Sequence, residues 1–187
     1  TSSMAAAALL EETFPEGGDL YVVGMAGLFE AVEAEGFGTF SEGNMPKNPV
    51  AVVAGVDWKI DYQKLANASI LIQQGAPFYG TNPDKTFPTP EGLMPGAGTI
   101  LAAIETASGV APIVAGKPLP YLFKLAMQRM GVLPEETLMV GDRLETDVLG
   151  GQNAGCKTAL VLSGVSTRES GEKWEPKPDL IAENLEA

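Results

Sequence analysis

An apolar run that ends in a glycine and two aspartates constrains this chain more than any other stretch. In Leu138-Met-Val-Gly-Asp-Arg-Leu-Glu-Thr-Asp147, the first side chains are typical of a buried parallel strand, which Gly141 interrupts. Asp142 then comes at the carboxyl end of the predicted strand, and Asp147 where the next helix begins. Ligands bind at that edge of open α/β sheets, and carboxylates there suit a Mg²⁺ ion that also holds a phosphate. The same aspartates could instead cap a turn and a helix, so this stretch alone leaves both roles open.

The composition excludes several classes of function. The net charge of −12 argues against nucleic acid or an anionic membrane surface as a partner, although a local lysine and a metal can still attract a small phosphorylated molecule. The chain has no histidine, which excludes His-assisted hydrolysis and His-ligated zinc. The single Cys156 lies in an apolar context and predicts a buried thiol in a reducing, cytoplasmic compartment. Residues 4–10 are apolar but too few to span a bilayer.

Short apolar runs alternate with amphipathic segments along the whole chain. This alternation predicts an α/β fold with parallel strands. A stretch rich in Gly, Asn and Pro at 38–49 is expected to be a loop. The expected strands cover 20–23, 50–54, 78–81, 112–115, 138–140, 158–162 and weakly 180–181, and the expected helices cover 2–13, 28–34, 62–74, 99–107, 120–130 and 146–154.

Prolines and glycines gather around Lys85 and Phe87, between the two halves of the chain. We interpret residues 81–98 as a linker that carries a ligand-facing loop, with a plain surface loop as the alternative. The predicted organisation is an α/β domain over 1–80, this linker, and a second α/β part over 99–187.

A lysine follows another predicted strand. Gly116-Lys117-Pro118 comes directly after the apolar run that ends at Ala115. A fixed ammonium at such a strand end can neutralise a phosphoryl oxygen and hold a carboxylate nucleophile. Alone, Lys117 would be an ordinary surface lysine. Together with the aspartates, it predicts that two successive strand–helix units converge on one edge of a sheet.

Taken together, these motifs resemble the haloacid dehalogenase-like phosphatases. The resemblance covers nearly the whole chain and is greatest to the type IIA branch, which includes para-nitrophenyl phosphatases, phosphoglycolate phosphatases and pyridoxal phosphate phosphatases. It implies a Rossmann-like core with an α/β cap domain, the cap lying at about 1–80. The residues that carry it are Gly116-Lys117-Pro118, the stretch from Leu138 to Asp147, Ser163-Gly164-Val165, Thr81-Asn82-Pro83-Asp84 and Pro95-Gly96-Ala97-Gly98.

The resemblance implies a role for each matching position. Lys117 would contact the nucleophile and the phosphoryl group, Asp142 would bind Mg²⁺ directly, and Asp147 would order the water shell of the metal. The loop with Asn82, Asp84 and Phe87 would meet the leaving group of a small phosphorylated substrate. Pyridoxal phosphatases are expected to have a histidine near Phe87, and its absence argues against a pyridoxal substrate.

One departure from the family pattern concerns the nucleophile. In the family it is the first aspartate of an Asp-x-Asp motif on the first core strand, and no Asp-x-Asp precedes the cap region here. We therefore expect a core that is incomplete at its N-terminus, with the nucleophile upstream of Thr1 in a longer protein. The chain alone is expected to be unstable, to bind Mg²⁺ poorly and to be inactive. The family often pairs through its caps, and the predicted strands at 20–23 and 50–54 would leave sheet edges to cover, so a homodimer is expected.

Two other functions are compatible with an α/β fold. A non-catalytic module could bind a phosphorylated metabolite through Lys117 and the loop alone. A nucleotide-binding oxidoreductase would need a G-x-G-x-x-G motif that opens a helix after a strand, and the sequence has none. Only the phosphatase and the binding module therefore stay open.

Overall fold

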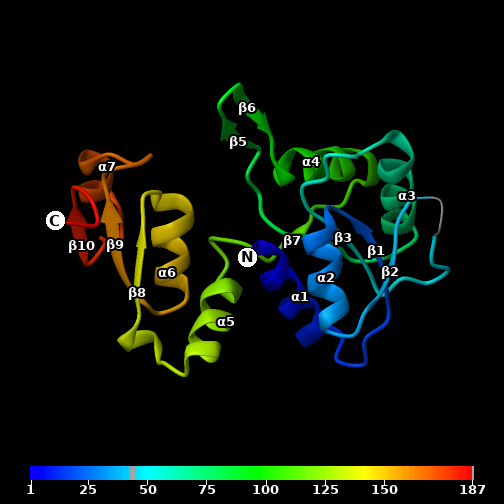
Figure 1. The fold of residues 1–187 in the computed structure, drawn as a ribbon, viewed down its shortest axis with the longest axis horizontal. Helices are drawn as coiled ribbons and strands as arrows, with labels where there is room; N and C mark the ends of the chain where they lie inside the picture. Colours follow the sequence, from blue (N-terminus) through cyan, green and yellow to red (C-terminus); the bar gives the residue numbers. More distant parts are fainter. Residues whose placement is uncertain (43–44, 187) are drawn as a thin grey trace. The chain divides into compact units, whose positions relative to one another are not determined.

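The computed structural model describes residues 1–42 and 45–186 and divides the chain into two compact units, Thr1–Gly116 and Lys117–Ala187 (Figure 1). Residues 43–44 of the predicted loop and residue 187 of the predicted core lie outside the described residues. Each unit is described by itself. Within the described ranges, no helix is long and apolar enough to cross a membrane.

The first unit is built on a five-stranded sheet in the order β2-β1-β3-β4-β7, in which every pairing is parallel. Its central strands are almost continuously apolar because both faces of the sheet are covered by helices. The strands are β1 (Asp19–Val23), β2 (Gly38–Phe40), β3 (Ala51–Ala54), β4 (Phe78–Gly80) and β7 (Ile113–Val114). The helices are α1 (Ser2–Thr13), α2 (Ala26–Ala34), α3 (Tyr62–Gln73) and α4 (Ala97–Ser108).

Helices cover the two faces of this sheet in pairs. Helices α3 and α4 pack together on one face, where their apolar side chains meet Tyr21, Val23 and Val52. Helices α1 and α2 lie against each other, in front of the sheet in Figure 1. Leu20 and Val22 alternate with the first set along β1 and are fully buried as well. The α/β class predicted from the sequence is confirmed.

The second unit contains a three-stranded parallel sheet in the order β10-β9-β8. The central strand β9 is buried, whereas β8 is an edge strand in the described part of the chain. Cys156 is buried against Met127, as expected, and burial raises the pKa of its thiol. The elements of this unit are α5 (Tyr121–Met130), the 3₁₀ turn η1 (Pro134–Glu136), β8 (Leu138–Gly141), the π-helix η2 (Leu144–Val148), α6 (Leu149–Asn153), β9 (Lys157–Val161), α7 (Arg168–Lys173) and β10 (Leu180–Ala182).

The structure divides the chain at a different place from the sequence analysis. The region 99–187 was expected to form one part, but α4 packs on α3 and β7 pairs with β4, so both belong to the first unit. The expected linker also contains an antiparallel hairpin, β5 (Thr86–Thr89) and β6 (Gly92–Pro95). Its prolines masked the strand pattern, because Pro is uncommon inside sheets. That the first unit acts as a cap stays a prediction.

The expected sheet edges are also different. Strands β1 and β3 were expected to leave edges to cover, but both are interior strands, and β2 and β7 lie at the edges. Strand β2 falls in the stretch expected to be a loop. It has only three residues, Gly38–Phe40, too few to show a strand pattern beside the Gly, Asn and Pro residues that follow. The homodimer therefore loses this part of its support and stays a prediction.

Candidate active site

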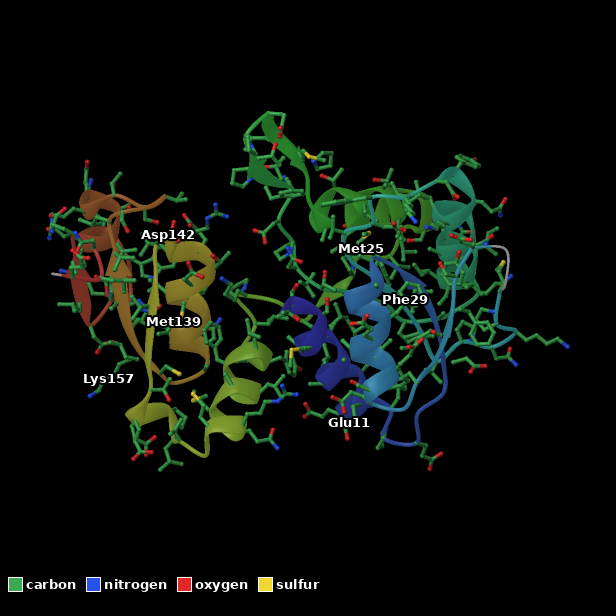
Figure 2. The ribbon with its side chains drawn as sticks, viewed as in Figure 1. Glu11, Met25, Phe29, Met139, Asp142 and Lys157 are labelled. Atoms are coloured by element: carbon green, nitrogen blue, oxygen red, sulfur yellow. The ribbon has the colours of Figure 1, made fainter. Side chains whose placement is uncertain are left out.

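Strand β8 places Asp142 at its carboxyl end, at the top of the strand in Figure 2. The side chain is half-buried, and its Oδ2 accepts a hydrogen bond of 2.9 Å from the backbone N–H of Val165. The backbone oxygen of Asp142 accepts a second one, also of 2.9 Å, from the N–H of Ser166. The Ser163-Gly164-Val165 loop therefore orients the carboxylate.

Asp147 is set by a π-helix that follows β8. The N–H of Val148 bonds to the carbonyl of Arg143 at 3.2 Å, which is the wide i→i+5 pattern that often marks functional sites. Asp147 Oδ2 accepts a hydrogen bond of 3.2 Å from the backbone N–H of Arg143. The sequence predicted an ordinary helix from about 146, because a π-turn has no distinct residue pattern.

Lys117 meets Asp147 directly. The distance from Nζ to Oδ1 is 2.6 Å, and the Asp147 side chain is only 9% exposed. A charge-assisted hydrogen bond of this length holds the ammonium in one place. The sequence analysis expected Lys117 and the aspartates to meet at one edge of a single sheet. That expectation is wrong, because β7 and β8 belong to different sheets. The chain after β7 instead brings Lys117 to the π-helix of the second unit.

Two glycines make room for the carboxylates. A Cβ at Gly141 would overlap the side chain of Asp147, and a Cβ at Gly164 would overlap the carboxylate of Asp142. Any larger residue at either place would displace an acidic side chain from its position. Glycine is therefore needed at these two positions for steric reasons, which the spacing of the motifs did not reveal.

The two carboxylates differ in what they can still bind. Both oxygens of Asp147 already accept hydrogen bonds, from Lys117 and from Arg143. Asp142 accepts its side-chain bond through Oδ2, so Oδ1 is the better placed oxygen for a hard divalent cation. Over 1–42 and 45–186, no group of three or more acidic, cysteine or histidine side chains could enclose a metal ion. The site therefore suits a cation that keeps several water ligands and takes a further ligand from the phosphate of a substrate.

The predicted leaving-group residues lie in the first unit. The amide of Asn82 donates to Asp84 Oδ2 at 2.8 Å and accepts from the Thr81 hydroxyl at 3.0 Å. The loop backbone packs against Gly96 and Gly98, where a Cβ would overlap the carbonyl oxygens of residues 84 and 83. Phe87 is half-buried on β5. The structure thus brings Asn82 and Asp84 together in a fixed loop.

The carboxyl edge of the first sheet contains a hollow of about 100 Å³. Asn82 lines it, together with residues from other strand ends and from the start of α1 and α2. Sequence reasoning missed this hollow, because its walls come from segments far apart in the chain. The other lining residues are Ser2, Ser3, Met25, Gly27, Leu28, Gly55, Val56 and Thr81.

The described residues thus place a carboxylate, Asp142, at the end of strand β8 and a lysine-bound aspartate, Asp147, in the π-helix that follows, as expected from the resemblance to the haloacid dehalogenase-like phosphatases. The HAD-hydrolase-like family model matches residues 114–187. The chain belongs to the haloacid dehalogenase-like hydrolases, in the type IIA phosphatase branch.

Three relatives illustrate this branch. The 5′-nucleotidase YutF of Bacillus subtilis is 39% identical over 99% of this chain and 70% of its own length. The acid sugar phosphatase of Staphylococcus aureus is 37% identical over 99% of this chain and 70% of its own length. The crystal structure of a glycerol phosphate phosphatase from Mycobacterium tuberculosis, in complex with magnesium, is 37% identical with a TM-score of 0.92, over 100% of this chain and 56% of that one.

Proposed function

We propose that the full-length protein is a Mg²⁺-dependent hydrolase of small phosphate monoesters that acts through an aspartyl-phosphate intermediate. The observation that carries this proposal is the Lys117–Asp147 ion pair, fixed at 2.6 Å in the same compact unit as the carboxylate of Asp142 at the end of β8. A bound cation, a fixed ammonium and oriented carboxylates are the groups that phosphoryl transfer requires.

Each residue has a distinct proposed role. Asp142 would bind Mg²⁺ directly, and the bound metal would neutralise phosphoryl charge. Lys117 would hold a phosphoryl oxygen and the nucleophile. Asp147 would hold the Lys117 ammonium and order the water around the metal. It would not bind the metal directly, because both of its oxygens already accept hydrogen bonds. These roles agree with the oxygen and nitrogen groups that the three side chains offer, and each role can be tested by substitution of its residue.

The nucleophile is proposed to lie on a segment upstream of Thr1. Strand β8 supports this, because among the described residues it is an edge strand, although its sequence, Leu-Met-Val, is that of a buried one and Leu138 is 51% exposed. A further strand beside β8 would cover these side chains and bring its own carboxyl end next to Asp142. YutF has further residues outside the matched part, since the chain covers 70% of its length.

The relatives support a small phosphorylated metabolite as the substrate without selecting one. Their names refer to a nucleotide, a sugar and glycerol phosphate. The phosphoryl group is common to all three, whereas the leaving group differs. We therefore propose that the second unit binds the phosphoryl group and that the Asn82–Phe87 loop of the first unit influences the choice of leaving group.

The direct test is phosphate release by the full-length protein. With Mg²⁺, it should hydrolyse para-nitrophenyl phosphate and some metabolite esters, and EDTA should abolish turnover until Mg²⁺ is restored. Turnover that persists in EDTA would contradict the assignment. Binding of phosphorylated ligands without any phosphate release would instead support the non-catalytic binding module.

Replacement of Phe87 by Ala should change substrate preference rather than chemistry. We expect the ratios of kcat/KM across a panel of esters to shift by about tenfold, while para-nitrophenyl phosphate is hydrolysed within about twofold of the wild-type rate. The reason is that contacts to the leaving group alter specificity, whereas the phosphoryl site is unchanged.

The hairpin supplies its own control for this experiment. Phe87 pairs with Met94, and the next pair is Pro88 with Leu93, which therefore points to the opposite face. Leu93→Ala removes a similar apolar side chain from that face and should leave the preferences unchanged. If Phe87→Ala also leaves them unchanged, the loop has a structural role only.

A further inference from the structure

A tryptophan at the carboxyl edge of the first sheet is largely exposed. Trp58 follows the central strand β3 and is 70% exposed. Single exposed apolar residues are common on protein surfaces, so exposure alone would carry no inference. What distinguishes Trp58 is the turn that presents it.

The turn around Trp58 is fixed by its two neighbours. Asp57 Oδ1 accepts a hydrogen bond of 2.8 Å from the N–H of Lys59, and the N–H of Ile60 bonds back to the carbonyl of Asp57 at 3.3 Å. The ammonium of Lys64 binds both sides of the turn, at 2.9 Å from Asp57 Oδ2 and 3.1 Å from the carbonyl of Lys59. One cation thus closes the loop whose tip is Trp58.

This cation belongs to a buried ion pair. The side chain of Lys64 is 6% exposed and that of Asp57 is 2% exposed. Burial by itself would lower the pKa of Lys64, but the hydrogen bond and charge of Asp57, with Glu42 and Asp61 adding to them, outweigh it and raise the pKa. Lys64 therefore stays protonated at neutral pH. Buried pairs are often no more stable than apolar packing, so a conformational role is a reasonable explanation for this one.

The position of the turn in the sheet favours a ligand. The strand order is that of a doubly wound sheet, in which ligands bind outside the carboxyl ends of the strands where the order reverses, here between β1 and β3. The hollow of about 100 Å³ lies at this edge, and Gly55 and Val56, which line it, lead directly into Asp57 and Trp58. Sheet topology and cavity therefore indicate the same edge independently.

We propose that Trp58 is a stacking surface for an uncharged planar group, such as a nucleobase or an aryl ring, in the leaving group of the substrate. Asp57 and Lys64 are its positioning residues. This inference rests on the proposed function and narrows its substrate class. Aromatic rings stack on bases and aryl groups through their faces. The acidic residues Glu42 and Asp61 near the turn, and the net charge of −12, disfavour a leaving group with further carboxylates.

Substitutions of Trp58 in the full-length protein separate stacking from bulk. Trp58→Leu should lower kcat/KM about tenfold for a nucleoside 5′-monophosphate and for para-nitrophenyl phosphate, mainly through KM, and leave glycerol phosphate within about twofold. Trp58→Phe keeps an aromatic face and should retain most of the selectivity. An equal effect on all three esters would overturn the proposal, and so would a change of oligomeric state without a change of selectivity.

A binding measurement keeps the inference separate from the proposed function. A free nucleoside should quench tryptophan fluorescence in a saturable way, and the Trp58-dependent part of this signal should be missing in Trp58→Phe. If no ester is hydrolysed but this quenching is present, the proposed function fails while the stacking surface stands. No Trp58-dependent quenching would overturn the stacking surface.

The positioning role has a matched pair of variants. Lys64→Met removes the cation that closes the turn, and Lys59→Met removes a neighbouring lysine that contributes only backbone groups, its N–H and its carbonyl, to the turn. Lys64→Met should reduce the selectivity for aromatic esters as Trp58→Leu does, and Lys59→Met should not. Asp57→Asn, which keeps the shape of the turn, tests the same role if Lys64→Met does not fold. If a folded variant of Lys64 or Asp57 keeps the wild-type selectivity for aromatic esters, the positioning role is overturned.

Discussion

Replacement of Asp142 by Asn in the full-length protein is expected to lower Mg²⁺-dependent turnover at least about 100-fold, since loss of even an indirect partner of a metal costs about 10- to 100-fold. Asparagine has nearly the same shape and can still accept the hydrogen bond from the N–H of Val165. It lacks the negative charge that holds a divalent cation. The fold should therefore be kept and the metal site weakened. Turnover across a Mg²⁺ titration measures the first effect, and thermal unfolding the second.

The motif contains a matched control for this substitution. Glu145 lies between Asp142 and Asp147 in the sequence and is exposed. Glu145→Gln removes one negative charge from the same stretch and should leave turnover within about twofold. A wild-type rate of turnover in Asp142→Asn would contradict the assignment of this residue as a metal ligand. Equal losses in both variants would point to net charge rather than coordination.

Residues 1–187 alone are expected to hydrolyse no phosphate ester, whereas a protein extended upstream should do so. Covalent phosphoryl transfer needs a carboxylate in line with the phosphorus. Asp142 is proposed to hold the metal, and Asp147 is bound by Lys117 and Arg143, so neither is available for attack. The extension should also stabilise the fold by covering the edge of β8. Both proteins would be assayed with para-nitrophenyl phosphate and Mg²⁺, and their thermal unfolding compared.

A separately produced upstream segment supplies the control. Mixed with residues 1–187, it should restore part of the activity if the two pieces associate. Equal activity of the short and extended proteins would place the nucleophile within the chain and leave Asp57, Asp61 and Asp84 to examine. The structure argues against the first two, since Asp57 is paired with Lys64 and Asp61 accepts the N–H of Lys64 at the start of α3.

The strand end that carries Asp142 could be placed from the sequence, because local patterns decide it. An apolar run followed by Gly141 and Asp142 forms a strand with an acid at its end, and the structure agrees to within a residue. Lys117 was predicted to lie at one site with the aspartates, and its Nζ lies 2.6 Å from Asp147 Oδ1, an ion pair that the sequence did not predict. Helices α3 and α5 begin and end within about a residue of their predicted limits, since the cap Asp61 and Gly131 mark them.

What the tertiary structure alone decided is the pairing of segments that are distant in the sequence. A strand pattern shows that β7 exists but not that it joins β4, so only the structure moves α4 and β7 into the first unit. The buried Asp57–Lys64 pair and the hollow beside Asn82 depend on contacts across the fold, and no local pattern encodes such contacts. Residue types and their spacing thus determined which chemistry the chain can hold. Long-range packing decided where each group lies, because side chains apart in sequence meet only when the sheet has formed.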